Sequence, residues 1–600
     1  MKNYPRINFE EITPDVFSGE LEIKEKPIGA KVFRNLVVAF GIFCIIVFAR
    51  LFSLGVADGD FYRARAEANV SQIFIERAPR GIIYDRYGEI LAGNRDSINL
   101  YVRSSELVRN NEMEAAEALY TVVFGGGENE FKTILTEKNL QLGNFIPFKS
   151  GLTKEQAIKI ESSGLKSLFV NVGSTRFFDP AFSHIVGYSG LTNQEEVKGG
   201  LSNVDIIGRS GVEAEYDNLL RGENGRLITY RNVQGVPVSE QEVNKAIPGQ
   251  DLVTTIDAKL QKYFYEALTE RMRQLGRSRG VGIAIDPQNG ELLALISVPS
   301  FSPDKISEAL ASPDNSLFNR AIAGLYSPGS TIKPMIAVAA LVEKIIRPED
   351  LILSTGYIEI PNPYYPDQPS RFVDWKPQGW VNIYSALARS CNVYFYTVGG
   401  GYGEITGLGV KNLKKYFGIF GLNNVTEIDL PGEKKGNADS LGSRKSWTIG
   451  DTYHISIGQG DILVTPLELL NAISSIVNGG FLRRITLTPQ NEPKLLADLS
   501  EFVPEMKEVI KGMEDGVYES YGTAYSLHDL PLKIAAKTGT AQIENNARIN
   551  ALFVGCAPME SASPPRICLL VLVEDAKEGS SNALPVAYQV FKWYAENRLK

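Results

Sequence analysis

The sequence predicts an α+β protein in which one membrane-spanning helix precedes two modules built from helices and strands. Three observations lead to this prediction. One apolar run near the N-terminus is long enough to cross a bilayer. Strand-like apolar patterns occur at both ends of the C-terminal region, and helix-like patterns lie between them. This order favours a C-terminal domain whose sheet is assembled from its two ends, with helices packed on it.

The composition excludes several classes of protein. Of the 600 residues, 44% are hydrophobic and 22% are charged, which is typical of globular proteins with sizeable cores. The net charge of −8 argues against a nucleic-acid-binding protein. Four cysteines are too few for a disulfide scaffold, and we expect Cys556 and Cys568, in apolar strand patterns, to be buried thiols. We predict neither a metal site nor a cofactor, because the three histidines are scattered: His184, His454 and His528.

The apolar run is predicted to be a transmembrane anchor. It covers residues 36–49 and continues over residues 51–56, beyond Arg50. Four cations precede it: Lys24, Lys26, Lys31 and Arg34. The positive-inside rule therefore places residues 1–34 in the cytoplasm, residues 35–56 in the membrane and the rest of the chain on the outer face.

A cleaved signal peptide is the competing interpretation, because residues 55–57 could serve as a cleavage site. The long polar tail before the apolar run favours an uncleaved anchor instead. No second run of spanning length follows in the sequence. We therefore expect one exported body attached to one helix.

Behind the anchor, residues 57–248 are predicted to form a spacer and interaction module. Residues 79–92 have the pattern of a strand, a tight turn and a second strand. Residues 100–245 mix short helix and strand patterns, and no group of catalytic side chains stands out there. A Pro-Gly pair marks the boundary to a C-terminal domain of residues 249–600.

Strand patterns frame this C-terminal domain. Asp257 is a candidate cap for a helix over residues 258–271. Residues 280–296 predict a hairpin around an Asn-Gly turn. Two strands and an amphipathic helix are expected near the C-terminus, at residues 549–556, 567–573 and 584–597.

Ser330 is the candidate nucleophile. Ser-Pro-Gly precedes it and an apolar, Ala-rich run over residues 335–342 follows, so we expect Ser330 where a turn becomes a helix. Lys333 then lies one helical turn later, on the same side. A serine hydroxyl needs a base to take its proton, and a lysine can be that base if burial keeps it neutral. The N–H of Ser330, at the helix start, is placed to stabilise an oxyanion.

The spacing Ser-x-x-Lys alone is a weak signal, because it also begins at Ser163 and at Ser302. Two later motifs strengthen it. Ser390 and Asn392 follow a helix predicted over residues 382–389. The last motif comprises Lys537, Thr538, Gly539 and Thr540. This order of three motifs is typical of penicillin-binding proteins and serine β-lactamases.

With these motifs and their surroundings, residues 79–574 resemble class B penicillin-binding proteins, the membrane-anchored transpeptidases of peptidoglycan. Further stretches that carry the resemblance are Arg80-Gly81, Asp85-Arg86, Thr255-Ile256-Asp257, Gly450-Asp451-Thr452 and Gly522-Thr523-Ala524. Residues 207–213 and 390–396 are similar to the elongation-type enzyme, penicillin-binding protein 2, rather than to the septal one. Ala536 and Asn550 stand where the family usually has Gly and His, and neither departure removes a catalytic group.

The resemblance implies an architecture and a chemistry. The C-terminal domain would be a serine β-lactamase-like transpeptidase domain, an antiparallel sheet with helices on both sides, carried on an elongated α+β pedestal of the dimerisation type over residues 57–248. Ser330 would attack the D-alanyl-D-alanine end of a stem peptide after giving its proton to Lys333. β-Lactams would acylate the same serine.

The resemblance also implies roles for the other motif residues. Ser390 and Asn392 would relay protons and hold the substrate amide. Lys537 would attract the substrate carboxylate and keep Lys333 neutral by repulsion. The residues expected to bind substrate are Thr538, Gly539 and Thr540, with the N–H of Thr540 completing the oxyanion hole.

Partners and alternatives follow from the same resemblance. Besides stem peptides and β-lactams, a polytopic polymerase of glycan strands in the bacterial cytoplasmic membrane is the implied partner. The alternatives are a septal transpeptidase, a D,D-carboxypeptidase or β-lactamase, and a non-enzymatic scaffold or β-lactam sensor. Trp375 and Trp380 either line an active-site loop or belong to a loop that packs on its own aromatic side chains.

Overall fold

The structure is a computed structural model, and the residues that it describes are 29–57, 71–127, 129–137, 146–202, 205–231, 237–362, 365, 367–490, 492–543, 548–560, 564–576 and 579–599. Most of the predicted cytoplasmic tail, residues 1–28, lies outside them. The chain separates into two compact units, Met1–Phe74 with Leu227–Val243 and Ile75–Arg226 with Asn244–Lys600. The first unit contains the apolar helix, and the second contains the whole candidate site.

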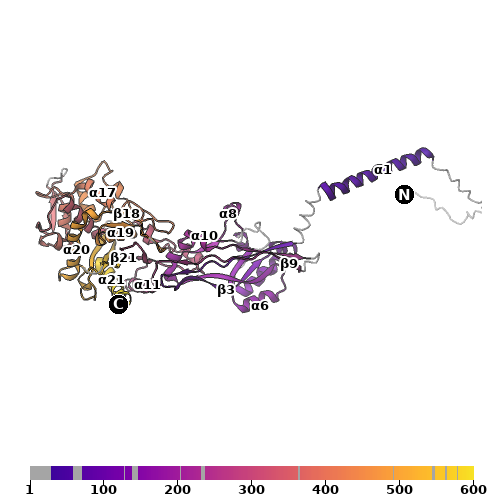
Figure 1. The fold of residues 1–600 in the computed structure, drawn as a ribbon, viewed down its shortest axis with the longest axis horizontal. Coiled ribbons are helices and arrows are strands. Elements are labelled where there is room, and N and C mark those ends of the chain that lie inside the picture. The colour runs from indigo at the N-terminus through magenta and orange to yellow at the C-terminus, as the bar shows by residue number, and fades with distance from the viewer. Residues whose placement is uncertain are drawn as a thin grey trace, which may run out of the picture. The chain divides into compact units, whose positions relative to one another are not determined.

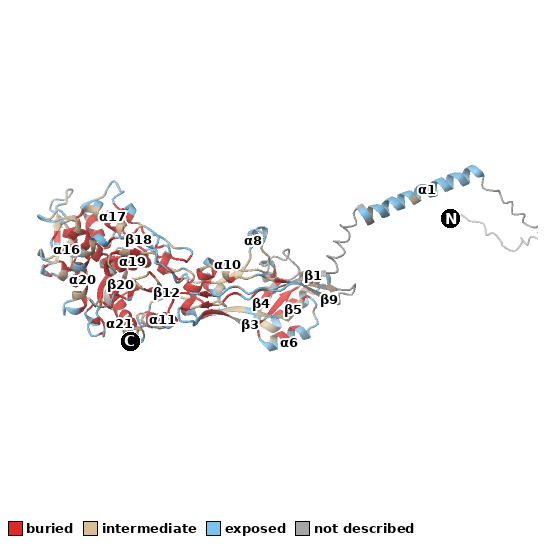
Figure 2. Ribbon diagram, in the orientation of Figure 1, coloured by how far each residue is buried: buried red, intermediate tan, exposed pale blue. Residues whose placement is uncertain are grey.

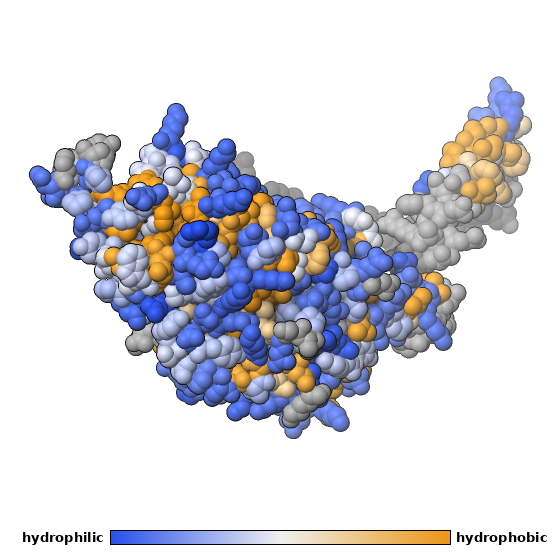
Figure 3. Space-filling model, turned by 60° about the vertical axis from the view of Figure 1, so that its left-hand side comes forward, coloured by the Kyte–Doolittle hydropathy of each residue, from blue (hydrophilic) through white to orange (hydrophobic). Residues whose placement is uncertain are grey.

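The predicted anchor is an α-helix, α1 (Ala30–Phe52), followed by a π-helical turn over Ser53–Ala57. The helix begins at Ala30 rather than at the predicted residue 35, and it therefore includes the cations Lys31 and Arg34. Its apolar side chains are exposed, as Figure 3 shows. Among the described residues, α1 is the one helix that is long and apolar enough to span a membrane.

The second unit begins with a five-stranded sheet that forms the centre of the pedestal (Figure 1). Strand β5 (Leu168–Phe178) pairs along its whole length with β3 (Ile90–Val102), which also pairs with β4 (Ile146–Leu152). The two short strands are β2 (Ile83–Tyr84) and β10 (Leu252–Val253). Three helices share a buried apolar cluster with this sheet: α4 (Met113–Phe124), α5 (Glu130–Glu137) and α6 (Lys154–Ser162).

The predicted strand, turn and strand over residues 79–92 are present as β2 and β3. One carboxylate closes the turn, because Asp85 Oδ1 accepts hydrogen bonds from the N–H groups of Tyr87 at 2.8 Å and Glu89 at 2.7 Å. Asp85 Oδ2 accepts a third hydrogen bond, from the N–H of Ala258 at 3.1 Å. Ala258 is the first residue of α11 (Ala258–Leu275), so Asp85 ties the pedestal to the first helix of the C-terminal domain.

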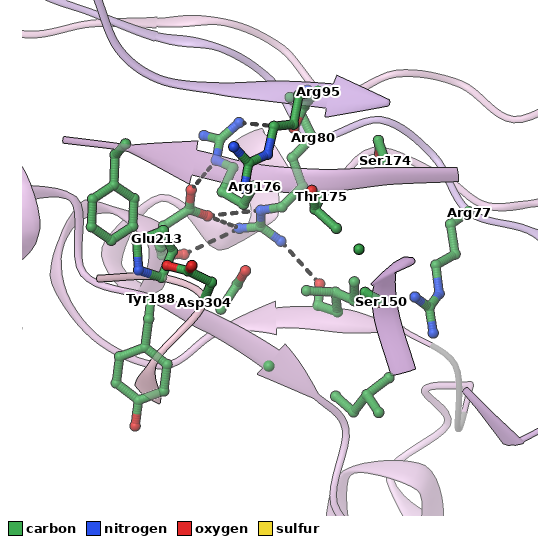
Figure 4. Close-up of a pocket in the computed structure, with 18 of the residues that line it drawn as sticks. Arg77, Arg80, Arg95, Ser150, Ser174, Thr175, Arg176, Tyr188, Glu213 and Asp304 are labelled. Carbon is green, nitrogen blue, oxygen red and sulfur yellow. Dashed lines mark hydrogen bonds and ion pairs between the residues drawn. The ribbon is translucent and has the colours of Figure 1, made fainter. Parts of the chain in front are cut away.

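A buried ion cluster joins three segments of the pedestal (Figure 4). Arg80 Nε lies 2.7 Å from Glu213 Oε2, and Arg176 Nε lies 2.6 Å from Glu213 Oε1. Glu213 is fully buried, and the two arginine side chains are only 7% and 8% exposed. The cluster lines a cavity of about 650 Å³. Arg80 also pairs with Asp217 at 2.9 Å, and the cluster connects β5 to the short helix α9 (Gly211–Glu215) through paired charges.

The C-terminal domain contains a five-stranded antiparallel sheet in the order β12-β11-β21-β20-β19. The strands are β11 (Gly280–Ile285), β12 (Leu292–Val298), β19 (Ala535–Ile543), β20 (Arg548–Ala557) and β21 (Ile567–Ala576). The sheet is therefore assembled from the two ends of the domain, as predicted. The turn between β11 and β12 uses the expected Asn-Gly pair, with Gly290 at a φ of +78°.

Helices cover both faces of this sheet, and both faces are buried (Figure 2). The first face carries α11 and α21 (Gly579–Arg598), in one apolar cluster with Phe553. The second face, which includes Val554, carries α19 (Pro466–Val477) and α20 (Val503–Tyr518), and α14 (Lys333–Val342) packs on these two helices in the same apolar cluster. Burial on both sides explains why these strands appear in the sequence as continuous apolar runs.

Cys556 and Cys568 form a disulfide, so the prediction of buried thiols is wrong. They lie directly opposite each other on β20 and β21, with their Cα atoms 4.1 Å apart. The pairing depends on the register of the two strands, and local sequence patterns do not determine that register. Cys391 is a buried free thiol.

Replacing Glu213 by alanine is expected to destabilise the protein strongly. The substitution leaves the buried guanidinium groups of Arg80 and Arg176 without the carboxylate that they share, which typically costs about 3–5 kcal/mol. Urea unfolding followed by circular dichroism measures the loss. The matched control is Glu270→Ala, which breaks an exposed ion pair with Arg273 and should leave the midpoint unchanged. Equal midpoints for the two variants would contradict a stabilising role for the buried cluster.

Candidate active site

Ser330 lies in the turn that leads into α14. The chain forms a 3-10 turn, η3 (Gly329–Ile332), and continues directly into the helix, so the expected change from turn to helix is present. Gly329 has a φ of +56°, and a Cβ at this position would lie 2.6 Å from the carbonyl oxygen of Thr540. Glycine therefore lets the turn approach β19 closely. Ser330 is half-buried, and its Oγ makes no hydrogen bond within the described part of the chain.

Lys333 is fully buried at the start of α14. Its Nζ donates hydrogen bonds to Asn392 Oδ1 at 2.7 Å and to the Ser390 carbonyl at 2.8 Å, and it lies 3.4 Å from Ser390 Oγ. Burial lowers the pKa of Lys333 to about 8, while Asp374 and Cys391 act in the opposite direction. The predicted desolvation of this lysine is present. Its hydrogen bonds lead to the turn of Ser390 rather than to Ser330.

Ser390 and Asn392 lie at a tight turn between α15 (Ile383–Ala388) and α16 (Asn392–Gly400). Ser390 has a φ of +56°, a left-handed conformation that is costly for a residue other than glycine and is concentrated at functional sites. Its Oγ accepts a hydrogen bond from Lys537 Nζ at 2.9 Å. The turn thus presents one hydroxyl to both lysines.

Lys537 lies in β19 and is 1% exposed. Its Nζ also donates a hydrogen bond to the carbonyl of Thr538 at 2.9 Å. Burial lowers the pKa of Lys537 well below the usual lysine value, and the charge of Lys333 lowers it further. Burial is the main effect that lowers the pKa of Lys333, and the expected repulsion between the two lysines opposes the protonation of both at once. Within the described residues, neither lysine forms an ion pair.

The other motif residues continue along β19. Thr538 is buried, and its Oγ1 donates a hydrogen bond to Thr523 Oγ1 at 2.8 Å. Gly539 lies against the Ser330 turn, because a Cβ there would lie 2.8 Å from Thr331 Cγ2. Thr540 is exposed. Among the described strands, β19 pairs with β20 alone and forms the edge of the sheet, and the exposed Thr540 is the threonine of this motif that is open to a substrate.

Asp374 contacts the turn of Ser390, although no sequence motif marks it. It lies in the segment between β13 (Ile352–Ser354) and β16 (Gly379–Val381), which pair with each other. Its Oδ2 accepts a hydrogen bond from the N–H of Asn392 at 2.8 Å, across a separation of 18 residues. The only available signal was an acidic residue in a Pro-rich segment, and this signal is not specific.

The structure separates the two tryptophans of this segment. Trp375 Nε1 donates a hydrogen bond to the carbonyl of Arg389 at 3.3 Å, next to Ser390. Trp380 pairs with Leu353 across β13 and β16 and is 63% exposed. Trp375 therefore borders the site, and Trp380 belongs to the surface of the small strand pair.

Both departures from the family pattern are accommodated. Ala536 is buried opposite Gly555, and a Cβ at Gly555 would lie 3.2 Å from Ala536 Cβ, so the glycine leaves room for the methyl group. Asn550 Oδ1 accepts a hydrogen bond from the N–H of Asp575 at 3.1 Å, which joins β20 to β21. In the described part of the chain, Asn550 forms no hydrogen bond with either buried lysine.

Comparisons with known proteins show the family to which the chain belongs. The family model of the penicillin binding protein transpeptidase domain matches residues 280–592, which is more than half of the chain. The model of the penicillin-binding protein dimerisation domain matches residues 75–254. The peptidoglycan D,D-transpeptidase MrdA of Haemophilus influenzae is 28% identical, and the match covers 94% of this chain and 92% of that protein.

Solved structures are also similar to this chain along most of its length. The penicillin-binding protein PBP2 of Helicobacter pylori, solved in complex with MreC, is 25% identical with a TM-score of 0.72, covering 88% of this chain and 99% of that one. A second structure has the description "Structural coordination of polymerization and crosslinking by a peptidoglycan synthase complex". It is 26% identical with a TM-score of 0.66, and the match covers 94% of this chain and 98% of that one. The chain therefore belongs to the penicillin-binding protein transpeptidase family, as a class B member of the elongation type.

Proposed function

We propose that this protein is a peptidoglycan D,D-transpeptidase of cell elongation, which cross-links stem peptides through an acyl-enzyme on Ser330. The observation that carries the proposal is the pair of buried lysines, Lys333 and Lys537, that meet at the hydroxyl of Ser390 beside the Ser330 turn. A buried lysine with a lowered pKa is partly neutral near physiological pH and can take a proton. A serine next to such a base is the arrangement that acyl transfer requires.

Acylation begins when Ser330 Oγ attacks the carbonyl carbon of the penultimate D-alanine. The proton of Ser330 passes to neutral Lys333, and the N–H groups of Ser330 and Thr540 stabilise the oxyanion. The C–N bond of the amide then breaks, and the terminal D-alanine leaves after its amine takes a proton through Ser390. The product is an ester between the stem peptide and Ser330.

The second half-reaction closes the cross-link. An amine of a neighbouring stem peptide attacks the ester carbonyl and loses a proton to the base, and Ser330 leaves with its hydroxyl restored.

Asn392 orients Lys333 through the hydrogen bond from Nζ to Oδ1. A substrate carboxylate near Thr540 favours a proton on Lys537, and this positive charge favours neutral Lys333. A β-lactam presents its amide in the same place and acylates Ser330.

The proposal also includes a location and a partner. Four cations precede the apolar run of residues 36–49, which favours an N-terminus in the cytoplasm and a catalytic domain on the outer face of the bacterial cytoplasmic membrane: Lys24, Lys26, Lys31 and Arg34. A polytopic glycan-strand polymerase is the proposed partner. Support comes from the similarity to the structure whose description joins polymerization and crosslinking in one synthase complex.

Ser330→Ala is expected to abolish cross-linking. The full-length protein in detergent is incubated with a lipid-linked precursor and a glycan polymerase, and cross-linked muropeptides are quantified after digestion. Because the serine forms the acyl bond, the variant should give no product above background. The control is Ser302→Ala, which removes the serine of another Ser-x-x-Lys sequence and should cross-link normally. Cross-linking by Ser330→Ala would disprove the mechanism, and trimmed stems without cross-links from the unsubstituted protein would indicate a carboxypeptidase.

Acylation should depend on pH through Lys333. Only the neutral lysine accepts the proton of Ser330, and its pKa is about 8, so the rate should rise with pH up to about 8 and level off above it. At a pH of about 6, roughly 1% of this lysine is neutral, so the rate should lie about 100-fold below the plateau. Stopped-flow fluorescence with a labelled penicillin measures the rate. A flat profile over this range would be incompatible with Lys333 as the base.

A further inference from the structure

We propose that Asp374 is a positioning residue for this reaction: its carboxylate holds the turn of Ser390 and Asn392 in the shape that brings both lysines to Ser390. The inference rests on the proposed function of Ser330 and Lys333. Asp374 acts on the reaction indirectly, through the backbone of this turn and through its charge.

The carboxylate of Asp374 is held by four donors. Oδ2 accepts hydrogen bonds from the N–H groups of Asn392 at 2.8 Å and Val393 at 3.1 Å, and from the thiol of Cys391 at 3.2 Å. Oδ1 accepts a hydrogen bond from the N–H of Trp375 at 2.8 Å. Three of the four donors belong to the turn and the start of α16, so the carboxylate fixes this part of the chain from outside.

Asp374 supplies a cap that α16 lacks in its own sequence. The first N–H groups of a helix have no partner within the helix. The residue before α16, Cys391, provides no side-chain cap. A carboxylate is favoured at this end of a helix both as a hydrogen-bond acceptor and as a negative charge. The start of α16, and Asn392 with it, is therefore held by a side chain from the preceding segment.

Asn392 connects Asp374 to the base. Its N–H binds Asp374 Oδ2, and its own Oδ1 accepts a hydrogen bond from Lys333 Nζ at 2.7 Å. The carbonyl of Ser390 accepts from the same Nζ at 2.8 Å, with Ser390 held at a φ of +56°. A rotation of this turn would break both hydrogen bonds to Lys333 and would move the Ser390 hydroxyl away from Lys537.

Asp374 also acts on the charge of the base. The titratable groups around Lys333 are Asp374 and Cys391 next to the turn, and Lys537 on β19. The negative charge of Asp374 favours protonated Lys333 and so opposes the effect of burial. Removing this charge without changing the shape of the side chain should lower the pKa of Lys333 further.

Three variants of the full-length protein in detergent separate these effects. Asp374→Asn keeps one oxygen that can accept the three hydrogen bonds from the turn, but it removes the negative charge and the acceptor for the N–H of Trp375. Asp374→Ala removes the charge and every acceptor. Asp367→Ala changes an exposed aspartate of the same segment and is the matched control. The rate constant of acylation by a fluorescent penicillin is measured from acid to alkaline pH, and the thermal midpoint from circular dichroism reports whether each variant is folded.

We expect Asp374→Asn to keep most of the plateau rate and to shift the acid limb of the profile to lower pH, because Lys333 then stays neutral at lower pH. Asp374→Ala should lower the plateau rate about 100-fold at a thermal midpoint near that of the control, because the turn loses its cap and misplaces the base. Asp367→Ala should match the unsubstituted protein throughout.

The proposal is wrong if Asp374→Asn titrates like the unsubstituted protein, or if Asp374→Ala acylates at the unsubstituted rate. If Asp374→Ala does not fold, the titration of Asp374→Asn decides alone. A failure of the proposed function looks different, because the unsubstituted protein would then not be acylated at all.

Discussion

Two lysine side chains are buried close together without an ion pair among the described residues, and the catalytic domain depends on this constraint. Removing an ammonium group from water is costly unless its charge is paired. Burial lowers the pKa of both Lys333 and Lys537. Lys333 Nζ donates hydrogen bonds to the Ser390 carbonyl and to Asn392 Oδ1, and Lys537 Nζ donates one to Ser390 Oγ. The burial that would destabilise an ordinary lysine thus lowers the pKa of Lys333 to about 8, so that part of this lysine is a neutral amine near physiological pH and can act as a base.

The fold achieves this burial with elements from distant parts of the chain. Lys333 begins α14, Ser390 precedes α16, and Lys537 lies on β19. The edge position of β19 is essential, because β20 pairs with one side of the strand and the other side faces the Ser330 turn and Gln459, whose Nε2 donates a hydrogen bond to the carbonyl of Thr540 at 3.2 Å. Gly329 and Gly539 have no side chain at the positions where this turn and β19 approach each other. The same packing that buries the lysines therefore brings the turn of Ser330 against β19.

Features that depend on close neighbours could be predicted from the sequence. The Asn-Gly turn before β12 and the change from turn to helix at Ser330 are set within a few residues, as is the cap at Asp257, whose carboxylate accepts a hydrogen bond from the N–H of Leu260. The motif residues could be assigned to one site only through the family resemblance, because spacing alone also selected Ser163 and Ser302.

Other features depend on packing between distant segments. The disulfide of Cys556 and Cys568 requires the register of β20 against β21. The contact of Asp374 with the start of α16 requires the path of the segment between β13 and β16. The sequence predicted that Lys333 is desolvated, but how far burial lowers its pKa depends on the packing of distant segments around it.

The most direct test of this account is intact mass spectrometry of the full-length protein in detergent, before and after incubation with benzylpenicillin. The account predicts a single stable adduct that maps to Ser330, is absent from Ser330→Ala and persists in Ser302→Ala. An adduct on another residue, or no adduct on folded protein, would contradict the account, and hydrolysis of the penicillin without an adduct would assign the site to a β-lactamase.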